Sequence, residues 1–225
     1  MRLSFHLFLV GTALTAVIAG PTVAEDDAPA PALTVTATGS ALAADPAWRE
    51  LFVQLGAARS RYSTFEESRY FPFRRTPVIL PGEIRILPGR GLSLRYPEPK
   101  ERIMIVDADG VLLRDAKGRE RAAPRDGHAQ AATTALTNVL QFDLPALQEA
   151  FTVEGTRDGA AWTLTFTPRE AELAERLGTI QVDGEDNQLQ RIEMRQSDRQ
   201  RIEIVIGESQ ADVIFTSAEI QRFFR

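Results

Sequence analysis

The chain offers few residues of the types that do chemistry. It contains no cysteine and, beyond its first 24 residues, a single histidine, His128. A zinc site built from histidine and cysteine is therefore excluded for a single chain. A Ser-His-Asp triad could use only His128, which follows Asp126-Gly127 in a polar stretch. We interpret His128 as a solvated turn residue.

Two short segments come close to known motifs without completing them. Residues 207–211 read Gly-Glu-Ser-Gln-Ala, which lacks the second glycine of a nucleophile elbow. Residues 107–110 begin like a calcium loop, but the later ligands and the closing glutamate are missing, so we interpret them as a hairpin turn. Carboxylates are plentiful, and a hydrolase with paired carboxylates stays open as an alternative. The favoured interpretation is a protein that is not an enzyme and needs no metal or cofactor.

The first 24 residues have the pattern of a secretory signal peptide. Met1-Arg2 gives a positive start, residues 3–18 are mostly apolar, and Thr22-Val23-Ala24 offers small residues for cleavage before Glu25. An N-terminal membrane anchor is the alternative. The apolar run is shorter than the ~20 residues that a membrane span needs. We therefore predict cleavage after Ala24 and export to the periplasm.

The charge of the chain argues against a nucleic-acid partner. The formal net charge is −5, and removal of Arg2 with the signal peptide would make it more negative. Nucleic-acid-binding proteins usually carry a basic patch instead. Without cysteine, the chain has neither a disulfide nor a site for lipid attachment at a cysteine.

A helix begins the folded part of the chain. Residues 25–44 are rich in Ala, Pro, Thr and Asp without periodicity, and we expect a flexible leader there. Asp45-Pro46 then resembles an N-cap followed by proline at the first helical position. Trp48, Leu51, Phe52 and Leu55 follow at helical spacing, so one face of this helix is apolar.

From about residue 63 the apolar residues repeat with a period of two, which predicts strands. Dipeptides typical of turns separate them: Asp109-Gly110, Lys117-Gly118, Asp158-Gly159 and Asp183-Gly184. Short strands joined by short turns favour an antiparallel meander. The expected strands cover residues 63–73, 82–87, 91–96, 101–107, 111–115, 119–123, 151–157, 160–167, 179–183, 188–196, 199–207 and 211–217.

Helical intervals interrupt this pattern in two places. Residues 128–142 and 144–150 show helical spacing of apolar residues. A shorter helix is predicted to begin with a capping box at residues 167–170 and to end near Gly178. No repeat of solenoid period is present.

The strict alternation gives each strand one polar face and one apolar face, as in Arg191–Arg195 and Trp162–Phe166. A twisted sheet of ten or more strands tends to curl, and its apolar faces then line the concave side. The covering helices are few and short. Either they fill the concavity or a cavity remains.

The order of these motifs resembles the outer-membrane lipoprotein carrier proteins (LolA) and their LolA-like relatives. The resemblance begins with the helix and the strand at residues 62–69, and continues with the glycine-led hairpin at 82–96 and its Pro88. It includes the strand into an Asp-Gly turn at 103–110, the strand ending in Thr-Pro at 162–168 and the paired amphipathic strands at 188–206. Where well-known members carry an arginine before the proline of that hairpin, this chain has Leu87.

The resemblance implies a mainly β fold: a curled antiparallel sheet that forms an unclosed β-barrel, covered by helices, with a hydrophobic cavity. Residues 45–225 would then be a single lipid-carrier domain. It would carry the acyl chains of a lipoprotein or lipid across the periplasm, between an inner-membrane donor complex and an outer-membrane acceptor. We expect a monomer.

Strand parity predicts which residues line the cavity, because these lie opposite polar neighbours on each strand. The predicted lining is Phe65, Ile84, Ile86, Leu92, Leu94, Tyr96, Trp162, Leu164, Phe166, Ile192, Met194, Ile202 and Ile204. The helix at 128–142 is the predicted lid. Its narrow apolar stripe would hold it weakly to the sheet: Ala132, Leu136, Val139 and Leu140.

One further reading stays open at this stage. The same fold could serve as an interaction or accessory module whose cavity has collapsed. Since an acyl chain gains roughly 0.8 kcal/mol for each methylene that leaves water, a carrier needs no chemistry beyond burial, and we favour the carrier.

Overall fold

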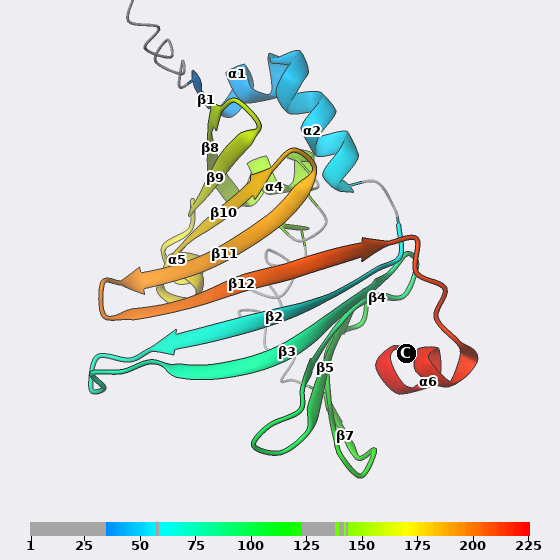
Figure 1. Cartoon of the computed structure of the whole chain (residues 1–225). Coiled ribbons are helices and arrows are strands. Elements are labelled where there is room, and N and C mark those ends of the chain that lie inside the picture. The colour runs from blue at the N-terminus through cyan, green and yellow to red at the C-terminus, as the bar shows by residue number, and fades with distance from the viewer. Residues whose placement is uncertain (1–34, 57–58, 123–137, 140–141, 143) are drawn as a thin grey trace, which may run out of the picture. The chain divides into compact units, whose positions relative to one another are not determined.

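One antiparallel sheet of twelve strands dominates the fold (Figure 1). The structure is a computed structural model that describes residues 35–56, 59–122, 138–139, 142 and 144–225. The strands are β1 (Val35–Thr38), β2 (Arg61–Tyr70), β3 (Val78–Leu87), β4 (Gly91–Tyr96), β5 (Arg102–Asp107), β6 (Gly110–Asp115), β7 (Glu120–Ala122), β8 (Phe151–Asp158), β9 (Ala161–Pro168), β10 (Thr179–Glu185), β11 (Gln188–Ser197) and β12 (Gln200–Ala211).

The order in the sheet is β1-β8-β9-β10-β11-β12-β2-β3-β4-β5-β6-β7. Consecutive strands pair as hairpins, as the short turns predict. There are two exceptions. β1 pairs with β8, and β12 pairs with β2 from Arg201 opposite Tyr70 to Ala211 opposite Arg61. Among the described residues the edge strands β1 and β7 do not pair with each other, so the sheet stays open. The prediction of an unclosed barrel is confirmed.

Five helices lie in the described part of the chain: α1 (Gly39–Ala44), α2 (Pro46–Gly56), α4 (Leu144–Ala150), α5 (Ala171–Leu177) and α6 (Ser217–Phe223). We call the sheet face that α2 covers the inner face and the opposite one the outer face. Figure 1 shows α1, α2 and α4 beside the β8–β11 part of the sheet, and α6 beside β4 and β5. α2 has the bounds that the sequence predicts.

The leader expected at residues 25–44 is wrong over its described part. Val35–Thr38 forms β1, which pairs with β8, and α1 follows it directly. The reason is Leu42, which is completely buried in the core. Composition alone suggested an irregular segment, because a single apolar anchor in an alanine-rich stretch has no periodicity.

Another correction concerns Asp183-Gly184, which is not a hairpin turn. Both residues lie inside β10, where the pairing with β11 shifts register. A Cβ on Gly184 would lie 2.1 Å from the Trp162 ring, so the glycine makes room for the indole. The turn comes later, after Glu185, where Asp186 has a φ of 50°.

The predicted strand at 211–217 is also wrong. Asp212 adopts a φ of 57° and ends β12. Helix α6 follows, with Thr216 as its N-cap in a capping box with Glu219. The capping box expected at residues 167–170 does not form, because α5 begins at Ala171 after Glu170, which makes no side-chain cap bond.

Ion pairs hold the outer face together. Arg191 donates to Asp183 over 2.8 Å and to Glu203 over 2.6 Å, and it also pairs with Glu193. These partners lie on β10, β11 and β12, so one guanidinium joins three strands. Burial opposes the charge of Arg191, but the hydrogen bonds to Glu203 and Asp183 outweigh it and raise the pKa of Arg191, which stays protonated.

Helix α6 is fixed to the outer face of β5 and β6 by apolar and ionic contacts. Arg222 donates to Glu101 over 2.7 Å, and Arg95 donates to the same Glu101 over 2.7 Å. Arg225 pairs with Asp107. The apolar cluster beneath α6 consists of Ile103, Ile105, Leu112, Phe215, Phe223 and Phe224.

Candidate ligand cavity

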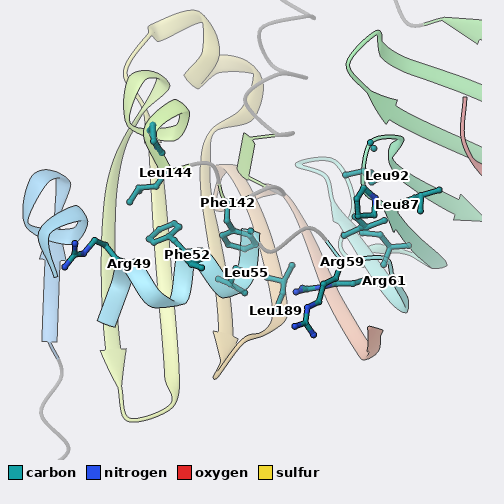
Figure 2. Close-up of a pocket in the computed structure, with 18 residues that line it drawn as sticks. Arg49, Phe52, Leu55, Arg59, Arg61, Leu87, Leu92, Phe142, Leu144 and Leu189 are labelled. Atoms are coloured by element: carbon teal, nitrogen blue, oxygen red, sulfur yellow. The ribbon is translucent and has the colours of Figure 1, made fainter. Parts of the chain in front are cut away.

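An open cavity of about 760 Å³ lies between α2 and the β3–β4 hairpin (Figure 2). This volume falls in the range of roughly 300–1,000 Å³ that is usual for small-molecule sites. In Figure 2, Phe52 and Leu55 reach it from α2, while Leu87 and Leu92 reach it from the hairpin. The apolar lining is Phe52, Val53, Leu55, Ile84, Ile86, Leu87, Pro88, Leu92, Phe142, Leu144, Pro145 and Leu189.

The N-cap of α2 sets the orientation of the first wall. The Asp45 carboxylate accepts hydrogen bonds from the backbone N–H groups of Ala47 and Trp48, over 2.8 and 3.3 Å. This satisfies two donors that the helix itself leaves unpaired. With the helix start fixed, Phe52 and Leu55 face inward, and both are buried.

The register of the β3–β4 hairpin sets the second wall. Ile84 lies opposite Leu94, and Ile86 lies opposite Leu92, so all four share the inner face. Gly91 starts β4 with a φ of 87°, a conformation that side-chain-bearing residues rarely adopt. A Cβ there would lie 2.1 Å from the Val106 carbonyl oxygen, so only glycine allows β4 to approach β5 this closely.

Three of the thirteen residues predicted as cavity lining border this cavity: Ile84, Ile86 and Leu92. Four others lie in the close-packed core with α1 and α2, away from the cavity wall: Trp162, Leu164, Phe166 and Ile192. They are 0–4% exposed. They share the parity of cavity residues, but they pack in one core cluster with the apolar residues of α2.

The remaining predicted lining residues also lie outside the lining of this cavity. Phe65 and Tyr96 form a separate buried cluster with Leu80, and Leu94 packs against it. Ile204 contacts both this cluster and the core. Met194 packs against the core, and Ile202 is partly buried on β12.

Only one residue of the predicted lid lies in the described part of the chain. Val139 is 1% exposed and belongs to the core cluster. Ala132, Leu136 and Leu140 lie outside the described residues. The lid therefore stays a prediction.

Sequence reasoning missed the wall that faces the hairpin. It identified the apolar stripe of α2, including Phe52 and Leu55, but assigned it to covering the sheet. Phe142 and Leu189 complete this wall, and the Phe142 ring packs edge-on against Trp162 at a centroid distance of 6.3 Å. No periodic signal marks Phe142, which adopts a φ of 53° in a turn.

The same reasoning missed three arginines at the cavity. Arg49, Arg59 and Arg61 are part of its lining, and Figure 2 shows Arg59 and Arg61 close together, near Leu189. Burial lowers the pKa of Arg61, and the charge of Arg59 lowers it further. The cavity therefore combines apolar walls with positive charge.

A buried ionic cluster lies on the inner face at the other end of β2. Glu67, 2% exposed, pairs with Arg69 and accepts a hydrogen bond from the Tyr96 hydroxyl. Burial and the neighbouring Glu67 carboxylate raise the pKa of Tyr96, so the phenol stays protonated. The described residues contain no cluster of potential metal ligands. This arrangement ties β2 to β4 and offers no activated nucleophile.

The family described as outer membrane lipoprotein carrier protein LolA-like matches residues 38–224. The chain belongs to this family. Its open antiparallel sheet with covering helices agrees with that assignment, and the resemblance stated from the sequence is confirmed. A search among curated proteins finds no match.

Solved structures similar to this LolA-like chain are distant in sequence. A LolA superfamily protein from Nitrosomonas europaea is 5% identical with a TM-score of 0.39, over 76% of this chain and 96% of that one. A DUF1329 family protein from Desulfovibrio piger is 8% identical with a TM-score of 0.37, over 75% and 93%. Likenesses this distant carry no argument about the ligand. Within the described residues, no helix is long and apolar enough to span a bilayer.

Proposed function

We propose that this LolA-like protein is a periplasmic carrier that binds the acyl chains of a lipoprotein or lipid and conveys them toward the outer membrane. Residues 1–24 would be its cleaved signal peptide. It would act as a monomer, take its cargo from an inner-membrane donor and release it to an outer-membrane acceptor. The carrier needs no catalytic residue, because burial of the acyl chains is sufficient to bind the cargo.

The observation that carries this proposal is the apolar cavity between α2 and the β3–β4 hairpin. Its volume of about 760 Å³ suits a small amphiphilic ligand. Ile84, Ile86 and Phe52 present side chains that a hydrocarbon chain could contact. The alternative, an accessory module of the same fold, requires a collapsed cavity, which this open space disfavours.

Lipid extraction tests the proposal directly. Mass spectrometry of protein purified from the periplasm is expected to find co-purified acyl lipid. The purified chain should also bind a fluorescent fatty-acid probe. Protein that carries no lipid and binds no probe would favour the accessory module.

A substitution in the cavity wall makes the test specific. Ile86→Gln places an amide against the acyl chain and should weaken probe binding roughly tenfold, because Ile86 lines the cavity. Ile214→Gln is the matched control, since Ile214 is 93% exposed and lies outside the cavity lining. Equal probe affinity in both folded variants would place the ligand elsewhere.

A further inference from the structure

A small polar pocket adjoins the apolar cavity and shares Arg59 and Arg61 with it. Its volume is about 120 Å³, against about 760 Å³ for the apolar cavity. Its other lining residues are Gln54, Asn187, Gln188, Ser209 and Ala211. Two guanidinium groups thus stand where an apolar space meets a space lined with amides and a hydroxyl.

The charged residues that line the two spaces are all arginines. Neither lining includes an aspartate or a glutamate, although the chain as a whole carries a net charge of −5. Arg59 has an ion-pair partner in Asp212 at 3.4 Å, but both side chains are more than half exposed. An exposed pair of this kind contributes little and leaves most of the positive charge available.

Arg61 is the more confined of the two. It is partly buried, and among the described residues its guanidinium has no salt bridge and no side-chain hydrogen bond. Burial and the charge of Arg59 lower the pKa of Arg61, and the Asp212 carboxylate offsets only part of this effect. An anion placed between the two guanidinium groups would relieve this repulsion and supply the missing hydrogen-bond acceptors.

We propose that the cavity selects an anionic amphiphile, whose hydrocarbon chain lies between α2 and the β3–β4 hairpin and whose acid headgroup binds Arg59 and Arg61. This inference rests on the proposed carrier function and adds the class of cargo. Carboxylate and phosphate headgroups share the required chemistry, because a guanidinium binds either through two parallel hydrogen bonds. A neutral acyl lipid would bring no negative charge to the two guanidinium groups.

Ligands with one chain length and different headgroups test this selectivity. Dodecanoate, dodecyl phosphate and dodecanol would compete with the uncharged fluorescent probe N-phenylnaphthylamine for the purified chain. We expect at least one of the two acids to bind about tenfold tighter than the alcohol, as charged hydrogen bonds of this type imply. The acid that binds more tightly then shows whether the natural headgroup is that of a fatty acid or of a phospholipid.

Substitutions test whether the two arginines cause the preference for acids over the alcohol. The double change Arg59→Gln with Arg61→Gln should abolish the preference for acids and leave dodecanol binding unchanged. Arg176→Gln, an exposed position on α5 outside both linings, removes one charge and should leave the preference intact. Raising the salt concentration on the unsubstituted chain should weaken the acids alone, which checks the inference without any change of sequence.

The outcomes separate this inference from the carrier function. Equal affinity for the acids and the alcohol, or an acid preference that survives the double substitution, overturns the anionic site and leaves the carrier intact. Failure of every ligand to displace the probe, or of the probe to bind, overturns the carrier function itself.

Discussion

The inner face of the sheet has a filled region and a hollow region, although both carry the same alternation of apolar and polar residues. In the core cluster that includes α1 and α2, Leu164 and Phe166 are completely buried. At the β3–β4 hairpin, Ile84 and Ile86 are only partly buried and border the cavity. The comparison teaches that strand parity selects the face, whereas the covering helices decide whether that face becomes core or cavity.

Glycine fixes where the filled region lies. A Cβ on Gly155 would lie 2.6 Å from the Leu42 side chain and 2.7 Å from the Trp48 ring. The bare backbone of β8 therefore lets α1 and α2 settle on this part of the sheet. No helix in the described part of the chain fills the space at Ile86, which leaves the cavity.

The largest expected effect comes from matched isoleucines in the two regions. Ile180→Ala, in the filled region, should lower the free energy of unfolding by about 2–5 kcal/mol, because Ile180 is completely buried and its removal leaves a void. Ile86→Ala should cost less, since part of its side chain already faces open space. Urea unfolding of both variants checks this order, and equal losses would mean that the two regions are packed alike.

An added side chain at Gly155 should come next in size. Gly155→Ala forces α1 and α2 away from β8 and should cost about 1–3 kcal/mol. Glu154→Ala is the control, because Glu154 is exposed on the adjoining position. Thermal melting of the two variants tests the claim, and similar melting temperatures would show that the helices do not depend on the bare strand.

The smallest expected effect is a pH dependence at α6, far from the inner face. The hydrogen bond from Arg95, together with that from Arg222, lowers the pKa of Glu101 below its usual range. Its contribution to stability is then fully present above the unfolded-state pKa and is lost as the pH falls through the folded-state pKa. Because these groups are partly exposed, Glu101→Gln should cost at most about 1 kcal/mol at pH 7.

Unfolding free energies of this variant and the unsubstituted chain at several pH values give the readout. The gap between them should narrow as the pH falls below about 4, the usual range of a glutamate. A gap that stays constant down to pH 3 would show that Glu101 is not charged in these ion pairs.

The strands were largely predictable from the sequence because alternation is a local signal that burial on one face imposes. Helix α6 was not, since Val213, Ile214 and Phe215 form a β-like run. Only the positive φ of Asp212 turns this run out of the sheet. The Thr216-to-Glu219 spacing of a capping box was the signal that could have revealed α6.

The cavity was predictable only in part. Parity placed Ile86 and Leu92 on the correct face, but it placed Trp162 there too, and no local signal tells which of these a distant helix will cover. The arginines at residues 59 and 61 escaped notice for a similar reason. Their role depends on β2 lying beside β12 and on the approach of Asn187 and Gln188, contacts between residues far apart in the sequence.

The two tryptophans of the chain lie in the same region, so its intrinsic fluorescence reports on that region. Trp48 and Trp162 both lie in the filled region, and Trp162 donates a hydrogen bond to the Asp186 carbonyl oxygen. Emission should therefore follow the docking of α1 and α2 but not that of α6, whose apolar cluster contains no tryptophan among the described residues. Phe142 packs against Trp162 and Phe52 packs against Trp48, and both rings line the cavity, so a bound chain could change that signal through either of them.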